Sequence, residues 1–189
     1  MQKAIPRNWR PHEILISLIV LALLLVFTYG LFFSAPYQGF YFNPSNGEVL
    51  EIYPTGNSNP GLEVGDLIER VGSISFETYH ERKTLSFFQN IQPGEIVDIV
   101  VRRNGETITV PWVYPGINGP ESRVRFVNVW WLAYIFWFVG ISTQLFMRPK
   151  DRRWHLFLAS NYLTALFIMF GGISSFRVFG SPLLLRVVA

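Results

Sequence analysis

The sequence predicts an α+β domain inserted among transmembrane α-helices, and three observations support this fold class. Half of the 189 residues are hydrophobic, only 15% are charged, and the mean hydropathy of +0.27 is too high for an ordinary soluble domain. One long apolar run lies near the N-terminus and two lie after residue 125. The roughly 90 residues between them carry strand and helix patterns and suffice for one small domain with its own core.

The first apolar run, Ile14 to Phe33, contains no charged residue. Its 20 residues would form a helix about 30 Å long, which matches the hydrocarbon thickness of a bilayer. A cleavable signal peptide is the alternative, because three basic residues precede the run. The run is longer than a usual signal core and Pro36 directly follows the candidate cleavage site, so we expect an uncleaved anchor.

Two further apolar runs, Val127 to Met147 and Trp154 to about Ile173, flank the polar segment 148–153. A hydrophobic, basic, hydrophobic order is typical of a transmembrane hairpin with a short loop. Beyond it, the apolar end of residues 175–189 predicts either a fourth span cut short or a tail that re-enters or lies on the membrane surface.

The charge distribution predicts the orientation of these runs. Segment 148–153 has four Lys and Arg against one Asp, and three Lys and Arg against one Glu precede the first run. Segment 36–125 instead has seven Lys and Arg against eleven Asp and Glu, a net charge of −4. Because short cytoplasmic loops carry the excess of basic residues, we expect 36–125 to lie outside the cytoplasm.

The predicted protein is therefore a multi-pass protein of the cell (plasma) membrane, in contact with the lipid bilayer. Its expected parts are a cytoplasmic N-terminus (1–13), a first span (14–35), an extracytoplasmic domain with a linker (36–125), a second span (126–147), a cytoplasmic loop (148–153), a third span (154–174) and an extracytoplasmic end (175–189).

The middle segment has a mixed strand and helix pattern. Ile96–Arg102 and Thr107–Val110 are rich in β-branched residues and are joined through Asn104-Gly105, which predicts a β-hairpin. A shorter apolar segment, Val49–Ile52, lies beside the turn pair Asn46-Gly47. Between these regions, Thr78–Asn90 lacks Gly and Pro and has apolar residues near helical spacing, so we predict a helix there.

Two blocks of this segment resemble PDZ domains. Residues 59–72, NPGLEVGDLIERVG, are similar to the family's run of Gly-Leu, Gly-Asp, an apolar pair and a Val-Asn-Gly turn, although Gly72 stands where Asn-Gly is commoner. Pro93-Gly94-Glu95 and Arg102-Arg-Asn-Gly105 are similar to its closing strands and turn. The resemblance covers most of 36–115 and implies a small β-barrel or sandwich with two helices.

The resemblance also implies a binding mode, in which an extended C-terminal peptide adds a strand to an open edge and places its carboxylate among backbone N–H groups. It places the carboxylate-binding loop at Tyr37–Phe40 and the pairing strand at Phe40–Phe42, with the predicted helix as the opposite wall. The candidate peptide-binding residues are Gly39, Phe40, Tyr41, Phe42, His80, Thr84 and Phe87.

Each of these residues also has a plainer interpretation. His80 could be an exposed surface histidine, and Phe40 and Phe42 could be core residues, since strand aromatics commonly face inward. Gly39 could serve a simple turn. The groove itself could be closed, in which case the domain would transmit contacts without binding free peptide.

Catalytic and metal-binding patterns are missing from the sequence. The absence of cysteine excludes disulfides, thiolate metal sites and thiol nucleophiles. None of the three histidines forms His-Glu-x-x-His, and there is no Gly-x-Ser-x-Gly turn, phosphate loop or dinucleotide motif. We therefore expect no enzyme activity in this chain, no cofactor, no metal and no nucleic-acid partner.

The order of anchor, external PDZ-like domain and further spans resembles the input region of bacterial competence and quorum-sensing histidine kinases. That resemblance implies a sensor input module that binds a peptide or protein C-terminus. It also implies that the signalling output lies in a cytoplasmic domain missing from this sequence. A homodimer is one of the assemblies that it leaves open. The alternatives are a membrane-tethered PDZ adaptor in envelope protein quality control and an inactive partner of a membrane protease.

Overall fold

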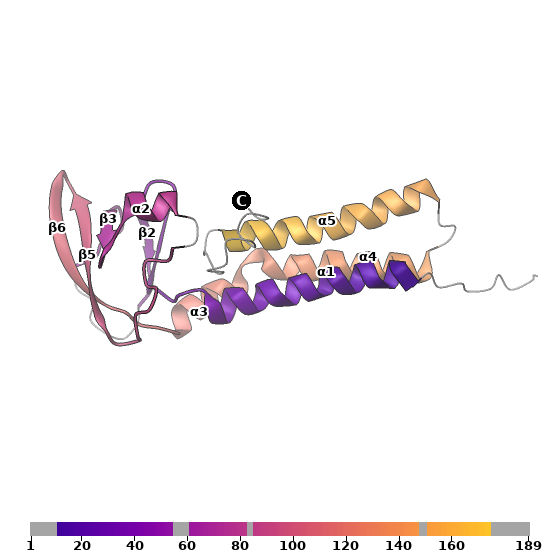
Figure 1. The fold of residues 1–189 in the computed structure, drawn as a ribbon, viewed down its shortest axis with the longest axis horizontal. Helices are drawn as coiled ribbons and strands as arrows, with labels where there is room; N and C mark the ends of the chain where they lie inside the picture. The colour runs from indigo at the N-terminus through magenta and orange to yellow at the C-terminus, as the bar shows by residue number, and fades with distance from the viewer. Residues whose placement is uncertain (1–10, 55–60, 83–84, 148–150, 175–189) are drawn as a thin grey trace, which may run out of the picture. The chain divides into compact units, whose positions relative to one another are not determined.

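A computed structural model describes residues 11–54, 61–82, 85–147 and 151–174 (Figure 1). The chain is a mixed α+β protein that divides into two compact units. One unit contains residues up to Thr28 together with Val129–Gly172, and the other is built from Tyr29–Asn128.

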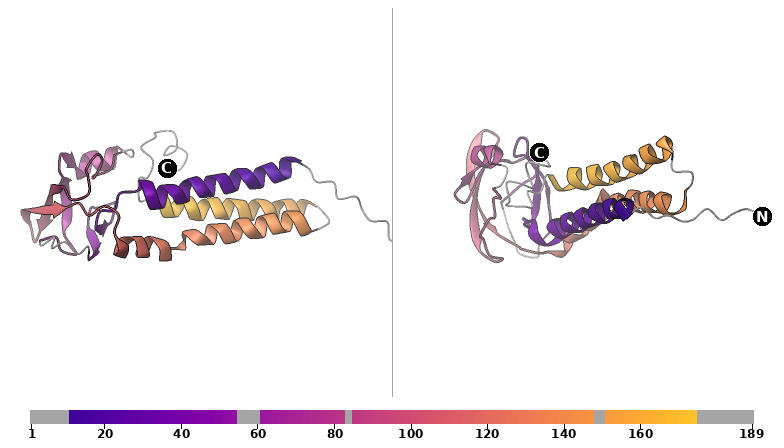
Figure 2. Two further views of the ribbon diagram at one scale, coloured as in Figure 1. Left: turned by 90° about the horizontal axis from the view of Figure 1, so that it is seen from below. Right: turned by 45° about the vertical axis from the view of Figure 1, so that its right-hand side comes forward.

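The helical unit consists of α1 (Pro11–Tyr29), the short 3₁₀ turn η2 (Val129–Trp131), α4 (Leu132–Phe146) and α5 (Arg152–Ser174). The boundary between the two units falls after Thr28, one residue before the end of α1. The long helices of this unit lie side by side in Figure 2. Small and polar residues mediate their contacts. The Tyr162 hydroxyl donates to Gln144 Oε1 at 2.8 Å, and a Cβ on Gly140 would lie 2.5 Å from the Tyr162 ring. Gly140 thus allows the close helix approach that membrane helices commonly use.

Three segments are long and apolar enough to cross a membrane: Ile14–Ser34, Gly119–Phe146 and Arg152–Gly171. Their exposed side chains are largely apolar, as in Phe138 and Phe167, which are 64% and 77% exposed. A bilayer would cover such surfaces, so a membrane protein is the class that fits.

The segment predicted as the second span, 126–147, is not one continuous helix. Its helix α4 begins only at Leu132, and a separate polar helix, α3 (Gly119–Val127), precedes it. The two are separated at Asn128, whose φ of −59° and ψ of 162° are not helical. The break coincides with a change in composition, because α3 carries Glu121, Arg123 and Arg125 whereas α4 has no charged residue.

The α+β unit contains two antiparallel sheets. β1 (Phe40–Phe42) pairs with β2 (Val49–Ile52), and the second sheet has the order β4 (Ile74–Ser75), β3 (Leu67–Val71), β5 (Ile96–Arg103), β6 (Glu106–Val113). The unit also contains α2 (Phe76–Glu81) and begins with the π-helical turn η1 (Gly30–Ser34), which continues the chain from α1.

The predicted hairpin is confirmed, because β5 and β6 pair along their whole length from Ile96↔Val113 to Arg103↔Glu106. Asn104 and Gly105 have φ angles of 53° and 87°. Positive φ at both central residues is the geometry for which Asn-Gly is favoured in two-residue hairpin loops.

The predicted helix Thr78–Asn90 is wrong in extent. Helix α2 ends at Glu81, Arg82 is extended, and residues 87–90 form a turn in which Asn90 has a φ of 65°. Packing explains this end. The adjacent rings of Phe87 and Phe88 stack on different partners, Tyr79 at 4.1 Å and Tyr114 at 5.0 Å, which a turn permits more readily than a short continuing helix.

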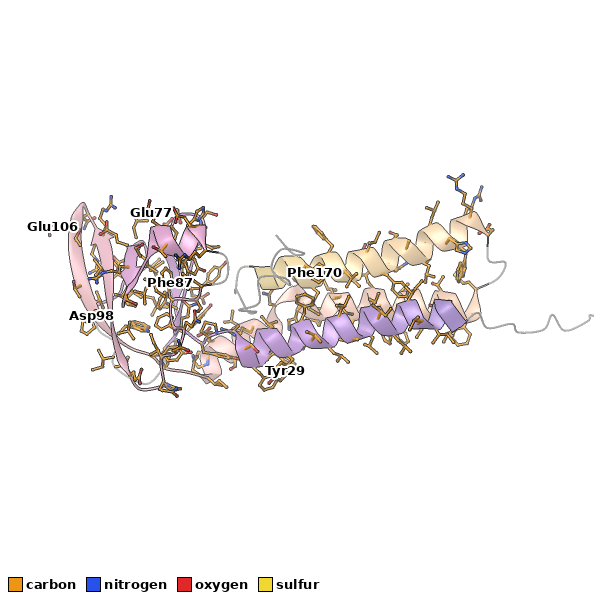
Figure 3. The ribbon with its side chains drawn as sticks, viewed as in Figure 1. Tyr29, Glu77, Phe87, Asp98, Glu106 and Phe170 are labelled. Carbon is orange, nitrogen blue, oxygen red and sulfur yellow. The ribbon has the colours of Figure 1, made fainter. Side chains whose placement is uncertain are left out.

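The core of this unit lies between the two sheets and α2 and is unusually aromatic. Its buried members are Phe40, Phe42, Val49, Leu62, Ile68, Val71, Tyr79, Phe87, Phe88, Val97, Ile99, Val101, Val110, Trp112 and Tyr114. Phe87 lies beneath α2 in Figure 3, whereas Glu77 lies on the outer side of that helix. Full burial of such side chains supplies about 1.5–3 kcal/mol each, which is the main stabilisation of the unit.

Candidate functional site

The loop Tyr37–Phe40, where sequence resemblance places carboxylate binding, is held by a buried charge. Gly39 has a φ of 81°, a conformation that glycine adopts without a Cβ clash. Its N–H donates to Glu121 Oε2 at 2.9 Å, and both groups are buried. The loop therefore already binds a carboxylate, which a side chain of the same chain supplies.

Glu121 forms an i,i+4 ion pair with Arg125 on helix α3. Arg125 Nη2 lies 2.6 Å from Glu121 Oε1, and the two side chains are 2% and 5% exposed. The side chain of Asn118, the N-cap of α3, accepts from the Glu121 N–H and donates to Glu121 Oε2. Three groups therefore orient the carboxylate: the Gly39 amide, the Arg125 guanidinium and the Asn118 amide.

Arg125 also binds the backbone that leads out of the first apolar helix. Its guanidinium donates to the carbonyls of Leu31 at 2.8 Å, Ala35 at 3.2 Å and Pro36 at 2.6 Å. The guanidinium carbon lies 3.8 Å from the centre of the Tyr37 ring. One cation thus joins segment 31–36, the loop and α3, in an environment where each charge-assisted hydrogen bond is strong.

Further bonds fix the loop from the side of the sheets. Trp112 Nε1 donates to the Gln38 carbonyl at 2.9 Å, and the Tyr53 N–H donates to the Gly39 carbonyl at 2.8 Å. Burial raises the pKa of the Tyr53 hydroxyl well above its usual range, and the nearby carboxylates of Glu51 and Glu121 add to this rise. Burial likewise raises the pKa of Tyr114, against a hydrogen bond from the Tyr37 backbone that lowers it. Both phenols therefore stay neutral at physiological pH.

The pairing strand β1 alternates in burial. Phe40 and Phe42 are 2% and 6% exposed and face the core, whereas Tyr41 between them is 37% exposed. This is the period of two expected for a strand with one buried face. Among the described residues β1 has a strand neighbour, β2, on one side only, and no strand pairs with its second edge.

On the opposite wall, His80 is exposed on α2, and Phe87 is buried against Tyr79 and Phe42. Thr84, the third residue predicted on this wall, lies outside the described residues. The structure therefore brings Phe40, Phe42 and Phe87 together in the core, and it leaves Tyr41 and His80 as the candidate residues with side chains at the surface.

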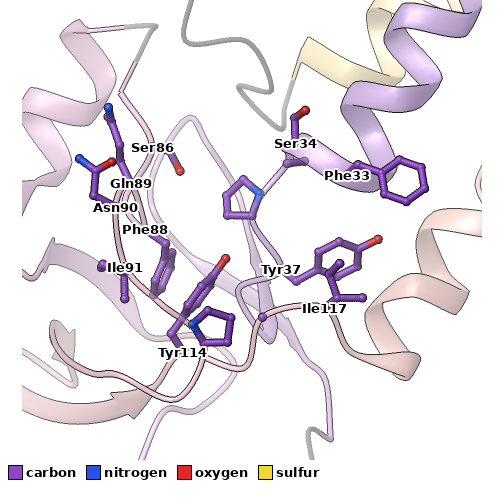
Figure 4. Close-up of a pocket in the computed structure, with 14 residues that line it drawn as sticks. Phe33, Ser34, Tyr37, Ser86, Phe88, Gln89, Asn90, Ile91, Tyr114 and Ile117 are labelled. Carbon is purple, nitrogen blue, oxygen red and sulfur yellow. The ribbon is translucent and has the colours of Figure 1, made fainter.

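A cavity of about 380 Å³ adjoins the loop. Figure 4 shows it between segment 33–37, the turn after α2 and the segment that follows β6, with Tyr37, Phe88 and Tyr114 among its lining residues. Its wall combines aromatic rings with the hydroxyls of Ser34, Ser86 and Tyr114, so it could hold a side chain that is partly apolar and partly polar.

The two sequence blocks that resemble PDZ domains meet through an ion pair. Asp66 of the Gly-Asp pair accepts two bonds from Arg103, at 2.7 and 2.8 Å, and one from the Glu63 N–H at 2.8 Å. Burial by itself raises the pKa of Asp66, but these hydrogen bonds outweigh it and hold the pKa below its usual value.

Sequence reasoning missed Glu121 and Arg125 as site residues. The available signal was an acidic and a basic residue four positions apart, directly before an apolar run, a spacing that places both on one helix face. Their partners in the loop and in segment 31–36 are 82 to 94 residues away, and no local pattern predicts those contacts.

Within the parts of the chain that the structure describes, no group of three or more His, Asp or Glu side chains is placed to hold a metal ion. No protein-family model matches the chain, and no curated protein matches it.

Proposed function

We propose that this chain is the input module of a membrane sensor, in which a PDZ-like domain formed by residues 36–125 binds a peptide or protein C-terminus outside the cytoplasm and passes the event to its membrane spans. The observation that supports this most is the hydrogen-bonded chain from the Gly39 amide through Glu121 and Arg125 to the carbonyls of 31–36. It connects the candidate binding loop to the backbone that continues the first span.

Recognition would use the edge of β1 that no described strand pairs with, together with the loop. An incoming strand would pair with the backbone of Phe40–Phe42, and its terminal carboxylate would lie at the Gly39 amide. Tyr41 and His80 are the exposed side chains that could contact it, and the cavity beside Tyr37 is the space for the terminal side chain.

The sensor is preferred to the adaptor because of segment 31–36. An adaptor needs only a tether, which an extended linker provides, whereas here a buried cation fixes the end of the first apolar helix to α3. A signal requires two arrangements with different ligand affinities, and a network that joins the loop to two span-leading segments is suited to such a switch.

The orientation can be tested by single-cysteine labelling, since the natural chain has no cysteine. Glu106 lies at the exposed β5–β6 turn, and Arg153 is exposed at the start of α5. We expect Glu106→Cys to react with a membrane-impermeant maleimide in intact cells and Arg153→Cys to react only after permeabilisation. The reverse pattern would place the α+β unit in the cytoplasm and contradict the proposal.

Peptide binding can be followed at one resonance. Gln38-Gly39 is the only Gln-Gly pair in the sequence, so labelling Gln carbonyl carbon and Gly amide nitrogen selects the Gly39 amide alone. In the full chain in lipid nanodiscs, a mixture of free-acid peptides should shift this signal, and the same mixture with amidated C-termini should not. Equal effects of the two mixtures, or none from either, would argue against a carboxylate-binding loop.

Hydrogen exchange separates the sensor from the adaptor. A sensor predicts that bound free-acid peptide changes the exchange of the amides in segment 31–36, because Arg125 binds that backbone. Binding that leaves this segment unchanged would favour the adaptor.

A further inference from the structure

We infer that Glu121 is a built-in ligand of the loop Tyr37–Phe40: its carboxylate occupies the place of a ligand carboxylate, and Arg125 is the cationic receptor of that place. This inference rests on the proposed function and adds how binding at the same site is regulated. An incoming carboxylate must displace Glu121 before it can reach the Gly39 amide.

The geometry is that of a carboxylate receptor. One oxygen of Glu121 accepts from the Gly39 N–H at 2.9 Å and the Asn118 amide at 3.2 Å, and the other accepts from Arg125 at 2.6 Å. A backbone amide, a side-chain amide and a guanidinium thus converge on one carboxylate. These are the donor types that bind free carboxylates in proteins.

The burial of the pair argues that it does more than stabilise. A buried ion pair contributes little net stability compared with apolar residues of similar volume, because both charges lose their hydration. Here a side chain 5% exposed is held by a partner 2% exposed, and the carboxylate divides its two oxygens between the loop and its own helix. A competing carboxylate that took over the Gly39 amide would therefore break the contact between Glu121 and the loop.

Displacement would have a defined structural result. The contact of Glu121 with Gly39 would be lost, whereas the bonds from Arg125 to the Leu31, Ala35 and Pro36 carbonyls need no carboxylate. Arg125 would then face the ligand carboxylate while still holding segment 31–36. Because the ligand carboxylate would replace Glu121 as the partner of Arg125, binding would release the loop from α3 and shift the cation together with the backbone of 31–36 that it holds.

The test uses the Gly39 resonance of the full chain in nanodiscs, with acetate as the probe. Glu121→Ala should shift the Gly39 amide proton upfield, and sodium acetate should restore its position. Acetamide and sodium chloride at equal concentration should not restore it. Glu106→Ala, which removes an exposed carboxylate at the β5–β6 turn, is the matched control and should leave the signal unchanged by mutation and by acetate.

Peptide affinity then separates this inference from the proposed function. A site occupied by its own side chain about 90% of the time binds about tenfold more weakly, so Glu121→Ala should bind free-acid peptides at least about tenfold more tightly than the natural chain. Equal affinity in the two proteins would overturn the inference and leave the proposed function standing. Restoration by acetate without peptide binding in either protein would overturn the proposed function and support the inference.

Folding of the variant is checked independently. The Trp112 indole N–H bonds to the Gln38 carbonyl, so its resonance reports whether the unit is intact. If Glu121→Ala loses this signal, Glu121→Gln replaces it, since it keeps the volume and removes the charge. A Gly39 signal that neither variant moves would show that Glu121 does not bind the loop in solution, and the inference would be wrong.

Discussion

Replacing Arg125 with methionine should lower the stability of the α+β unit by about 3–5 kcal/mol, because the change leaves the Glu121 carboxylate buried without its cation. Methionine keeps the apolar stem and removes the guanidinium, which serves Glu121 and the carbonyls of Leu31, Ala35 and Pro36. Hydrogen exchange of the Gly39 amide in the full chain measures the loss, since this amide is exposed only when the loop opens.

The matched control for Arg125→Met is Arg123→Met on the same helix. Arg123 is exposed, so its replacement should change the exchange of Gly39 by no more than about 0.5 kcal/mol. The double variant Glu121→Gln, Arg125→Met should recover part of the stability, because it removes the orphaned charge. If Arg125→Met behaves like Arg123→Met, the ion pair does not hold the loop.

The parts of the fold that could be predicted are those that local chemistry determines. The apolar runs follow from composition alone, and the β5–β6 hairpin follows from alternating β-branched residues around Asn104-Gly105. The helix predicted at Thr78–Asn90 is wrong in extent because tertiary packing, and not the local sequence pattern, determines the conformation after Glu81. Phe88 lies near helical spacing from Tyr79 and Leu85, but Phe87 and Phe88 pack on different core residues in a turn.

Only the backbone elements of the candidate site could be predicted from the sequence. Gly39 and the strand Phe40–Phe42 could be placed by resemblance to a family, and the alternation of burial along β1 then decides that Tyr41, not its neighbours, faces outward. The carboxylate partner of Gly39 could not be found, because Glu121 is 82 residues away and lies in what reads as a linker. Contacts between residues so far apart in the sequence depend on how the two sheets and α3 pack. No periodic pattern in the sequence predicts them.

Replacing Asp66 with asparagine should destabilise the α+β unit by about 1.5–3 kcal/mol at neutral pH, the range for a hydrogen bond to a charged group. Asp66 is 1% exposed and holds Arg103 through two hydrogen bonds, which tie β3 to the end of β5. Urea unfolding of the full chain in detergent, followed at the Trp112 indole resonance, measures the difference. Asp98→Asn on β5 is the control and should have little effect, because its side chain is exposed.

The ion pair of Asp66 and Arg103 also predicts how the difference in stability between the natural protein and Asp66→Asn depends on pH. Arg103 holds the pKa of Asp66 in the folded unit below the value of about 3.9 that an unfolded chain shows, so the unfolded state takes up the proton first as pH falls. The stabilisation is therefore complete above about pH 4 and declines as pH falls through the lower folded pKa. The natural protein and Asp66→Asn should converge in stability at acidic pH, whereas a gap that persists below both pKa values would show that Asp66 acts through packing and not through its charge.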